Sequence, residues 1–176
     1  RQSFDPPHYI NVAHDDPDAN SFSICLDGGY VSHPSTYDAP KWTANHNTIL
    51  VDGKGQLGEG GGWMQPVYGV DMRELSYLTG WKPAEDGRFI VEGEAGNAYP
   101  TLKRFRRAFI WLPGEYALVL DDIEADGPHT VAWQNLSERA EFTDPAAGRG
   151  VFVAENGARI PYQMLANRPI TGEIEW

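Results

Sequence analysis

The residues with the clearest chemical potential are histidines and acids near the start of the chain. His14, His33 and His46 fall within 33 residues, and the stretch HDDPDANSF, residues 14 to 22, adds three aspartates. Neutral imidazole and carboxylate are ligands that a borderline divalent ion such as zinc accepts. The spacing lacks the regularity of a zinc finger or an HExxH helix, so from residue types alone turn-capping aspartates and surface histidines are the stronger alternative.

The elements that must position these groups are predicted to be strands. The chain has 176 residues, and its 19 glycines and 13 prolines interrupt helical patterns along the whole length. Clusters of β-branched and aromatic residues recur between them, which is typical of an all-β antiparallel β-sandwich of roughly ten or more short strands with little helix. The predicted strands are 21–26, 29–32, 47–52, 74–79, 88–92, 103–112, 116–123, 129–135 and 150–154.

Three connections carry turn chemistry that predicts hairpins. LDGGY (26–30) and VDGKGQ (51–56) contain Asp-Gly pairs, and LPGEY (112–116) contains Pro-Gly. The glycine-rich stretch GQLGEGGGW (55–63) resembles a mobile loop beside a cleft more than a domain boundary. Because no repeat or interior linker is apparent, we predict one domain over residues 1–176.

Charge and cysteine content limit the function classes. Fourteen basic and 25 acidic side chains give a formal charge of -11, which argues against bulk nucleic-acid or membrane-surface binding. No apolar run approaches the length of a membrane span. Cys25 is the only cysteine and has no partner within the chain, so the sequence leaves the redox compartment open. Nothing in the sequence indicates an oligomeric state.

Several motifs together resemble a known family. HDDPDANSF followed by HNTILVDGKGQ (46–56) looks like the β-sandwich half of the heparinase II/III-like polysaccharide lyases, including their alginate-lyase relatives. AYPTLKRFRRAFIWLPGEYALVLDDIEA (98–125) and HTVAWQN (129–135) are similar to later strands of the same domain. The resemblance covers about residues 8 to 135, and HNTILVDGKGQ is its most specific part.

The resemblance implies chemistry and a partner domain. Members of this family join an α/α toroid to a C-terminal β-sandwich and cleave acidic polysaccharides by β-elimination. Such a reaction needs the uronate carboxylate neutralised, the C5 proton removed and the O4 leaving group protonated, for which His and Tyr are suited. This chain shows no helical repeats, so we expect it to correspond to the sandwich alone, without the toroid residues, and to be inactive by itself. The family also implies a periplasmic or extracellular location.

The same resemblance assigns roles to individual residues. It implies that His14 faces the substrate and that Asp16, His33 and His46 bind a structural zinc ion. Compared with the family, Asp16 and His33 exchange a histidine and a carboxylate between two positions, and the ligand set is preserved. Tyr37 corresponds to a sandwich tyrosine that assists the chemistry, although most of the eight tyrosines are expected to be packing groups.

Other candidates for glycan contact have competing structural interpretations. The basic run around Phe105 (103–107) is more typical of a charged edge strand than of a carboxylate-binding surface. Trp63, in its glycine loop, is the tryptophan best suited to stack on a sugar, whereas Trp111 and Trp133 lie in apolar strands.

Two function classes therefore follow from the sequence. One is the sandwich portion of an acidic-polysaccharide lyase acting on uronate-containing glycans such as alginate or a glycosaminoglycan. The other is a noncatalytic, metal-stabilised β-sandwich that binds glycans or has a structural role. Several hundred helical residues encoded before Arg1 would favour the lyase.

Overall fold

The computed structural model describes residues 9–11, 16–33, 40–61, 66–68 and 75–172, which fall into two compact units. Unit 1 contains residues 1–21 and 36–134, and unit 2 contains residues 22–35 and 135–176. Both units are built from antiparallel strands with short 3-10 helices, which confirms the predicted all-β antiparallel fold class. The single-domain interpretation stays a prediction. No helix in the described part of the chain is long and apolar enough to cross a membrane.

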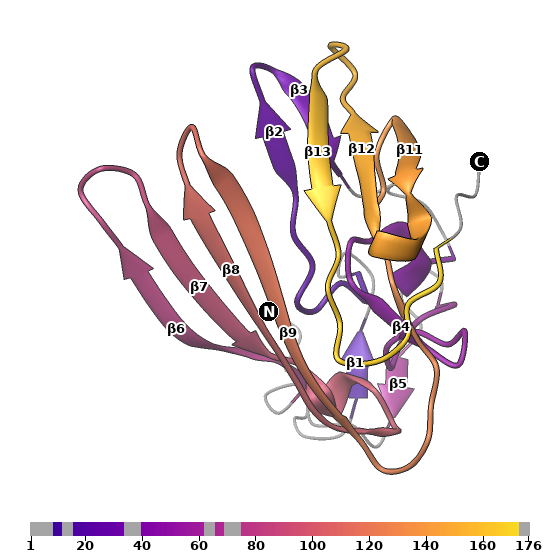
Figure 1. Cartoon of the computed structure of the whole chain (residues 1–176). Helices are drawn as coiled ribbons and strands as arrows, with labels where there is room; N and C mark the ends of the chain where they lie inside the picture. The colour runs from indigo at the N-terminus through magenta and orange to yellow at the C-terminus, as the bar shows by residue number, and fades with distance from the viewer. Residues whose placement is uncertain (1–8, 12–15, 34–39, 62–65, 69–74, 173–176) are drawn as a thin grey trace. The chain divides into compact units, whose positions relative to one another are not determined.

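A four-stranded sheet dominates unit 1, with the order β6-β7-β8-β9 (Figure 1). Its strands are β6 (Tyr77–Pro83), β7 (Phe89–Glu94), β8 (Leu102–Leu112) and β9 (Tyr116–Ala125). The Pro-Gly pair predicted the β8–β9 hairpin: Gly114 has a φ of 74°, and the Glu115 N–H donates to the Leu112 carbonyl at 3.1 Å.

Two further pairs of short strands also belong to unit 1. Strand β4 (Ile49–Val51) pairs with β10 (Val131–Trp133), and β1 (Tyr9–Asn11) pairs with β5 (Pro66–Tyr68). The 3-10 helices η1 (Thr43–Asn45) and η2 (Gly96–Ala98) precede β4 and β8. The second Asp-Gly pair forms a tight turn, with φ values of 52° at Asp52 and 71° at Gly53, but the hairpin predicted there was wrong, because β4 pairs with β10. Beyond it, Lys54 forms a bridge to Val51 and begins no named strand.

The core of unit 1 lies where β4, η2 and the start of β8 meet. Its buried members are Ile49, Val51, Ala95, Ala98, Tyr99, Leu102 and Phe105, with Trp133 packed against them. Tyr99 and Phe105 make an edge-to-face contact with ring centroids 5.9 Å apart. The buried Tyr99 hydroxyl donates to the Ile49 carbonyl at 2.7 Å and accepts from Gln56 Nε2 at 3.0 Å, and burial raises the pKa of Tyr99.

Tyr99→Phe is therefore expected to lower the free energy of unfolding by about 1–3 kcal/mol, because the buried Ile49 carbonyl and the buried Gln56 amide each lose one hydrogen bond. Urea denaturation followed by circular dichroism measures the change. Tyr116→Phe is the matched control, because Tyr116 is 56% exposed at the β8–β9 turn, and a change within about 0.5 kcal/mol is expected there. Equal effects of the two substitutions would contradict the assigned network.

Unit 2 contains a hairpin and a three-stranded sheet. The hairpin joins β2 (Ile24–Leu26) to β3 (Gly29–Ser32), and the sheet has the order β11-β12-β13. Its strands are β11 (Arg139–Asp144), β12 (Arg149–Val153) and β13 (Arg159–Gln163), with η3 (Pro145–Ala147) between the first two. Asn156 Nδ2 donates to the carbonyls of Leu26 and Asp27 at 3.2 Å, which fastens the hairpin turn to this sheet.

Candidate functional site

The motif HNTILVDGKGQ forms the centre of unit 1, and its residues contact the end of HDDPDANSF. Thr48 Oγ1 donates to the Ala19 carbonyl at 3.0 Å. The Gln56 side chain makes two hydrogen bonds to the backbone of Ala19. Its Oε1 accepts from the Ala19 N–H at 3.0 Å, and its Nε2 donates to the Ala19 carbonyl at 2.9 Å. The two stretches that carry the family resemblance are therefore joined directly.

Asn20 fixes the same segment from its other side. It has a φ of 58°, a left-handed conformation that asparagine tolerates, and its Nδ2 donates to the Phe105 carbonyl at 2.9 Å. The Ser21 N–H donates to the Asp18 carbonyl at 2.8 Å, closing the turn. Asp18 and Asn20 therefore shape the turn at the end of the HDDPDANSF stretch.

Arg107 ties both motif segments to the four-stranded sheet. Its side chain is 3% exposed and forms two 2.7 Å hydrogen bonds to the Asp121 carboxylate on β9. Its Nη1 donates to the carbonyl of Asn20 at 2.7 Å and to that of Asn47 at 2.9 Å. One guanidinium thus sets the separation between the segment that carries Asp16 and the segment that carries His46.

Asp16 and His46, both predicted as metal ligands, lie together in unit 1. His46 Nε2 is 3.9 Å from Asp16 Oδ1, and the imidazole is buried. Lys41, which the sequence did not single out, places its Nζ 3.6 Å from the same carboxylate oxygen and is fully buried. The Lys41 ammonium balances the Asp16 charge, as burial of ionised groups requires.

The chemistry of this pair fits two ligands of a zinc ion. A carboxylate oxygen and an imidazole nitrogen on a tetrahedral zinc ion stand about 3.3 Å apart, somewhat less than the observed 3.9 Å. Among the described residues no group of three or more histidine, cysteine or acidic side chains is gathered. The zinc ion and its ligand set stay a prediction.

The other predicted site residues are distributed as follows. His33 belongs to unit 2, where its N–H donates to the Leu136 carbonyl at 3.1 Å and its ring lies 5.6 Å from that of Tyr30. His14 and Tyr37, the predicted catalytic residues, and Trp63 lie outside the described residues. Their roles stay predictions.

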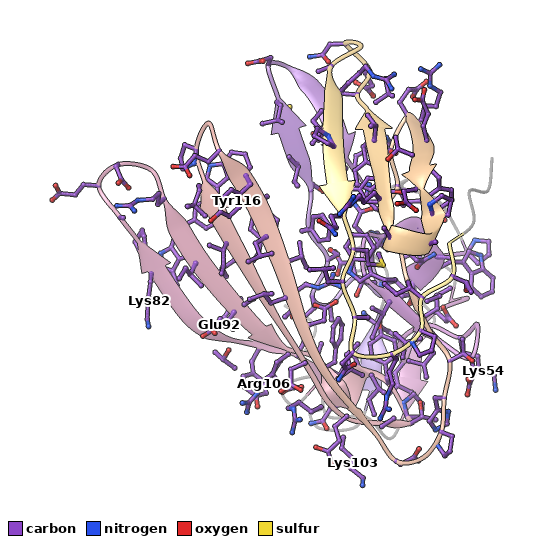
Figure 2. The ribbon with its side chains drawn as sticks, viewed as in Figure 1. Lys54, Lys82, Glu92, Lys103, Arg106 and Tyr116 are labelled. Atoms are coloured by element: carbon purple, nitrogen blue, oxygen red, sulfur yellow. The ribbon has the colours of Figure 1, made fainter. Side chains whose placement is uncertain are left out.

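The basic run on β8 is not an edge strand, so that interpretation was wrong. Strand β8 lies between β7 and β9, and the acids on those neighbours pair with its arginines. Arg104 contacts Asp122 and Glu124, each at 2.8 Å, and Arg106 contacts Glu94 at 3.1 Å. Arg106 projects outward from the sheet (Figure 2). The arginines are committed to intramolecular carboxylates, which argues against a glycan-binding role for this strand.

A second polar cluster, formed by Asp52, Asp126 and His129, was not predicted from the sequence. His129 Nδ1 lies 2.6 Å from Asp52 Oδ2, and His129 Nε2 lies 2.7 Å from Asp126 Oδ1. Hydrogen bonds to Asp52 and Asp126 raise the pKa of His129, whereas the bonds from His129 and from the Thr130 N–H lower the pKa of Asp52. One feature of the sequence could have indicated this cluster. Asp52 lies in the turn of HNTILVDGKGQ, and Asp126 lies just before HTVAWQN, which contains His129.

Comparisons with known proteins agree with the family resemblance of these motifs. The model of the family described as "Heparinase II/III-like, C-terminal" matches residues 6–171, which extends the resemblance past Glu138 through unit 2. A comparison with curated proteins found no significant match. Because the family model spans nearly the whole chain, this protein belongs to the heparinase II/III-like C-terminal family of polysaccharide lyases.

Proposed function

We propose that this chain is the β-sandwich portion of a lyase that cleaves uronate-containing polysaccharides by β-elimination. The observation that carries the proposal is that the two family-specific stretches are bonded to each other through Ala19, which brings Asp16 within 3.9 Å of His46. This contact supports the proposal because the HDDPDANSF stretch also contains His14, to which the resemblance assigns the substrate-facing role.

In this proposal His14 takes part in the proton transfers of the elimination, assisted by Tyr37. Asp16, His33 and His46 hold a zinc ion, which when bound supplies a structural cross-link and leaves proton transfer to side chains. The base or charge-neutralising groups missing from this chain come from an α/α toroid domain. The substrate is an acidic polysaccharide or oligosaccharide such as alginate or a glycosaminoglycan. The family is typically extracellular or periplasmic, and we propose the same location here.

The test compares the isolated 176-residue chain with the product of the native gene, including whatever that gene encodes before Arg1. Each is incubated with alginate or heparan sulfate, and the ultraviolet absorbance of the unsaturated uronate product is followed. We expect absorbance to rise only with the native product, and His14→Ala in that product to abolish the rise.

Two outcomes would contradict parts of the proposal. A robust rise with the isolated chain would show that it holds a complete active site, contrary to the expectation that it depends on a toroid. If the native product gave no rise on any uronate polymer but was retained on an immobilised one, the noncatalytic glycan-binding alternative would replace the lyase.

A further inference from the structure

Unit 1 contains a cavity of about 350 Å³ that no step of the proposed elimination uses. One wall comes from the motif turn and the loop after it, residues 51–59, and the other comes from Tyr99, Pro100 and Thr101. Lys54, at this rim, projects outward from the turn (Figure 2). The volume lies at the lower end of the range typical of small-molecule pockets.

A chain of short polar contacts connects the two walls. It begins at Asp52 in the first wall, whose Oδ2 lies 2.6 Å from His129 Nδ1, and passes through His129 Nε2 to Asp126 Oδ1 at 2.7 Å. It ends in the second wall, where the Asp126 N–H donates to the Thr101 carbonyl at 3.0 Å. Asp52 and Thr130 also exchange two hydrogen bonds of 2.9 Å. These bonds hold the Asp52 turn against the loop that carries His129.

The geometry requires a particular protonation state of His129. A neutral imidazole carries one N–H and presents a lone pair at its other ring nitrogen. Here both ring nitrogens face carboxylate oxygens, which in the ionised state only accept hydrogen bonds. Both contacts therefore form only when His129 is the doubly protonated imidazolium cation.

We propose that His129 is a pH-dependent latch that ties the two walls of this cavity together, closed while its imidazole is protonated and released when the proton is lost. A neutral His129 donates to one aspartate and repels the lone pairs of the other. Losing either contact interrupts the chain from Asp52 to Thr101 and frees this end of the cavity, while the Gln56–Tyr99 hydrogen bond still joins the walls elsewhere.

The charges around His129 define the pH range in which the latch is closed. Asp52 and Asp126 face it directly, and Lys54 acts on the Asp52 carboxylate from the same turn. The pKa of His129 is raised, chiefly by Asp52, so stabilisation by the latch is lost as pH rises through that raised value. The pKa of Asp52 is lowered, so the contribution of this carboxylate is lost only as pH falls through its lowered value.

Nuclear magnetic resonance of the intact chain tests the latch directly. The His129 ring resonances are titrated in the wild type, in Asp52→Asn and in Asp126→Asn, and hydrogen exchange of the Asp126 and Thr130 amides is measured across the same pH range. We expect His129 to titrate above its ordinary pKa in the wild type and lower in both variants. We also expect protection of the Asp126 amide, beyond the intrinsic pH dependence of exchange, to fall as His129 deprotonates.

Two comparisons separate the latch from general loosening of the fold. The Arg88 N–H donates to Asp86 Oδ1 at 3.2 Å in a turn whose cation is an arginine, so its protection should not change over the range in which His129 titrates. His129→Gln, which offers no titrating cation, should show an Asp126 amide without the pH-dependent step. A wild-type His129 pKa at or below its ordinary value, or Asp126 protection that persists through His129 deprotonation, would overturn the proposal.

Discussion

Replacing Arg107 with alanine is expected to lower the free energy of unfolding by about 3–5 kcal/mol, the usual cost of removing one partner of a buried ion pair. The substitution leaves the Asp121 carboxylate without its bidentate partner and removes the donor shared by the Asn20 and Asn47 carbonyls. It also removes the guanidinium from above the Phe105 ring, 5.2 Å from its centroid. Urea denaturation followed by circular dichroism and tryptophan fluorescence measures the effect.

The adjacent residue provides a matched control. Arg106 lies on the opposite face of β8, is 62% exposed and forms an ion pair with Glu94 at 3.1 Å. Arg106→Ala is expected to cost less than about 1 kcal/mol, as exposed ion pairs do. Arg107→Lys should fall between the two, because lysine keeps the charge but does not reproduce the bidentate fork. Comparable losses for Arg106→Ala and Arg107→Ala would show that the buried network has no special energetic role.

Local turn chemistry explains why much of the fold could be predicted. The Asp27-Gly28 pair has φ values of 50° and 78°, the conformation of a tight hairpin turn, and it lies between β2 and β3 as predicted. Strands β8 and β9 match their predicted spans within two residues, because long apolar alternation flanks a Pro-Gly turn. Such signals are local and do not depend on tertiary contacts.

Strands with weak local signals were missed. Strand β13 carries Pro161 at its centre, which ordinarily argues against a strand, and it is tolerated because β13 lies at the edge of its sheet. Strand β11 is short and carries charged residues at Arg139, Glu141 and Asp144. It is a strand because it pairs with β12, a tertiary contact that its own sequence does not indicate.

The candidate site likewise contains residues that could be predicted from the sequence and residues that could not. Residue types and family motifs singled out Asp16 and His46, and the structure places them 3.9 Å apart. Lys41 and Arg107 were not identified, because burial beside a carboxylate is a tertiary property that charge alone does not reveal. The basic strand was misinterpreted for the same reason, since the acids that neutralise Arg104 lie across the hairpin at Asp122 and Glu124.

Protein purified without chelator is expected to contain close to one zinc ion per chain, and His46→Ala is expected to lower both the zinc content and the unfolding midpoint. A metal that binds only the folded state stabilises it by mass action, by about 2.7 kcal/mol at a free concentration 100 times the dissociation constant. Elemental analysis and thermal unfolding, each with and without added zinc, measure the two effects. His14→Ala should spare both, because His14 is predicted to face the substrate.

His46 is buried, so its removal also costs packing energy that has nothing to do with metal. The contribution of zinc is therefore the part of the His46→Ala effect that disappears when wild type and variant are compared in chelator. Asp16 already has the buried Lys41 ammonium 3.6 Å away, so the metal-free carboxylate is not left unpaired and the apo protein should remain folded. Less than about a tenth of a zinc ion per chain, with a midpoint unmoved by added zinc, would leave Lys41 as the cation that holds Asp16 and would exclude the metal.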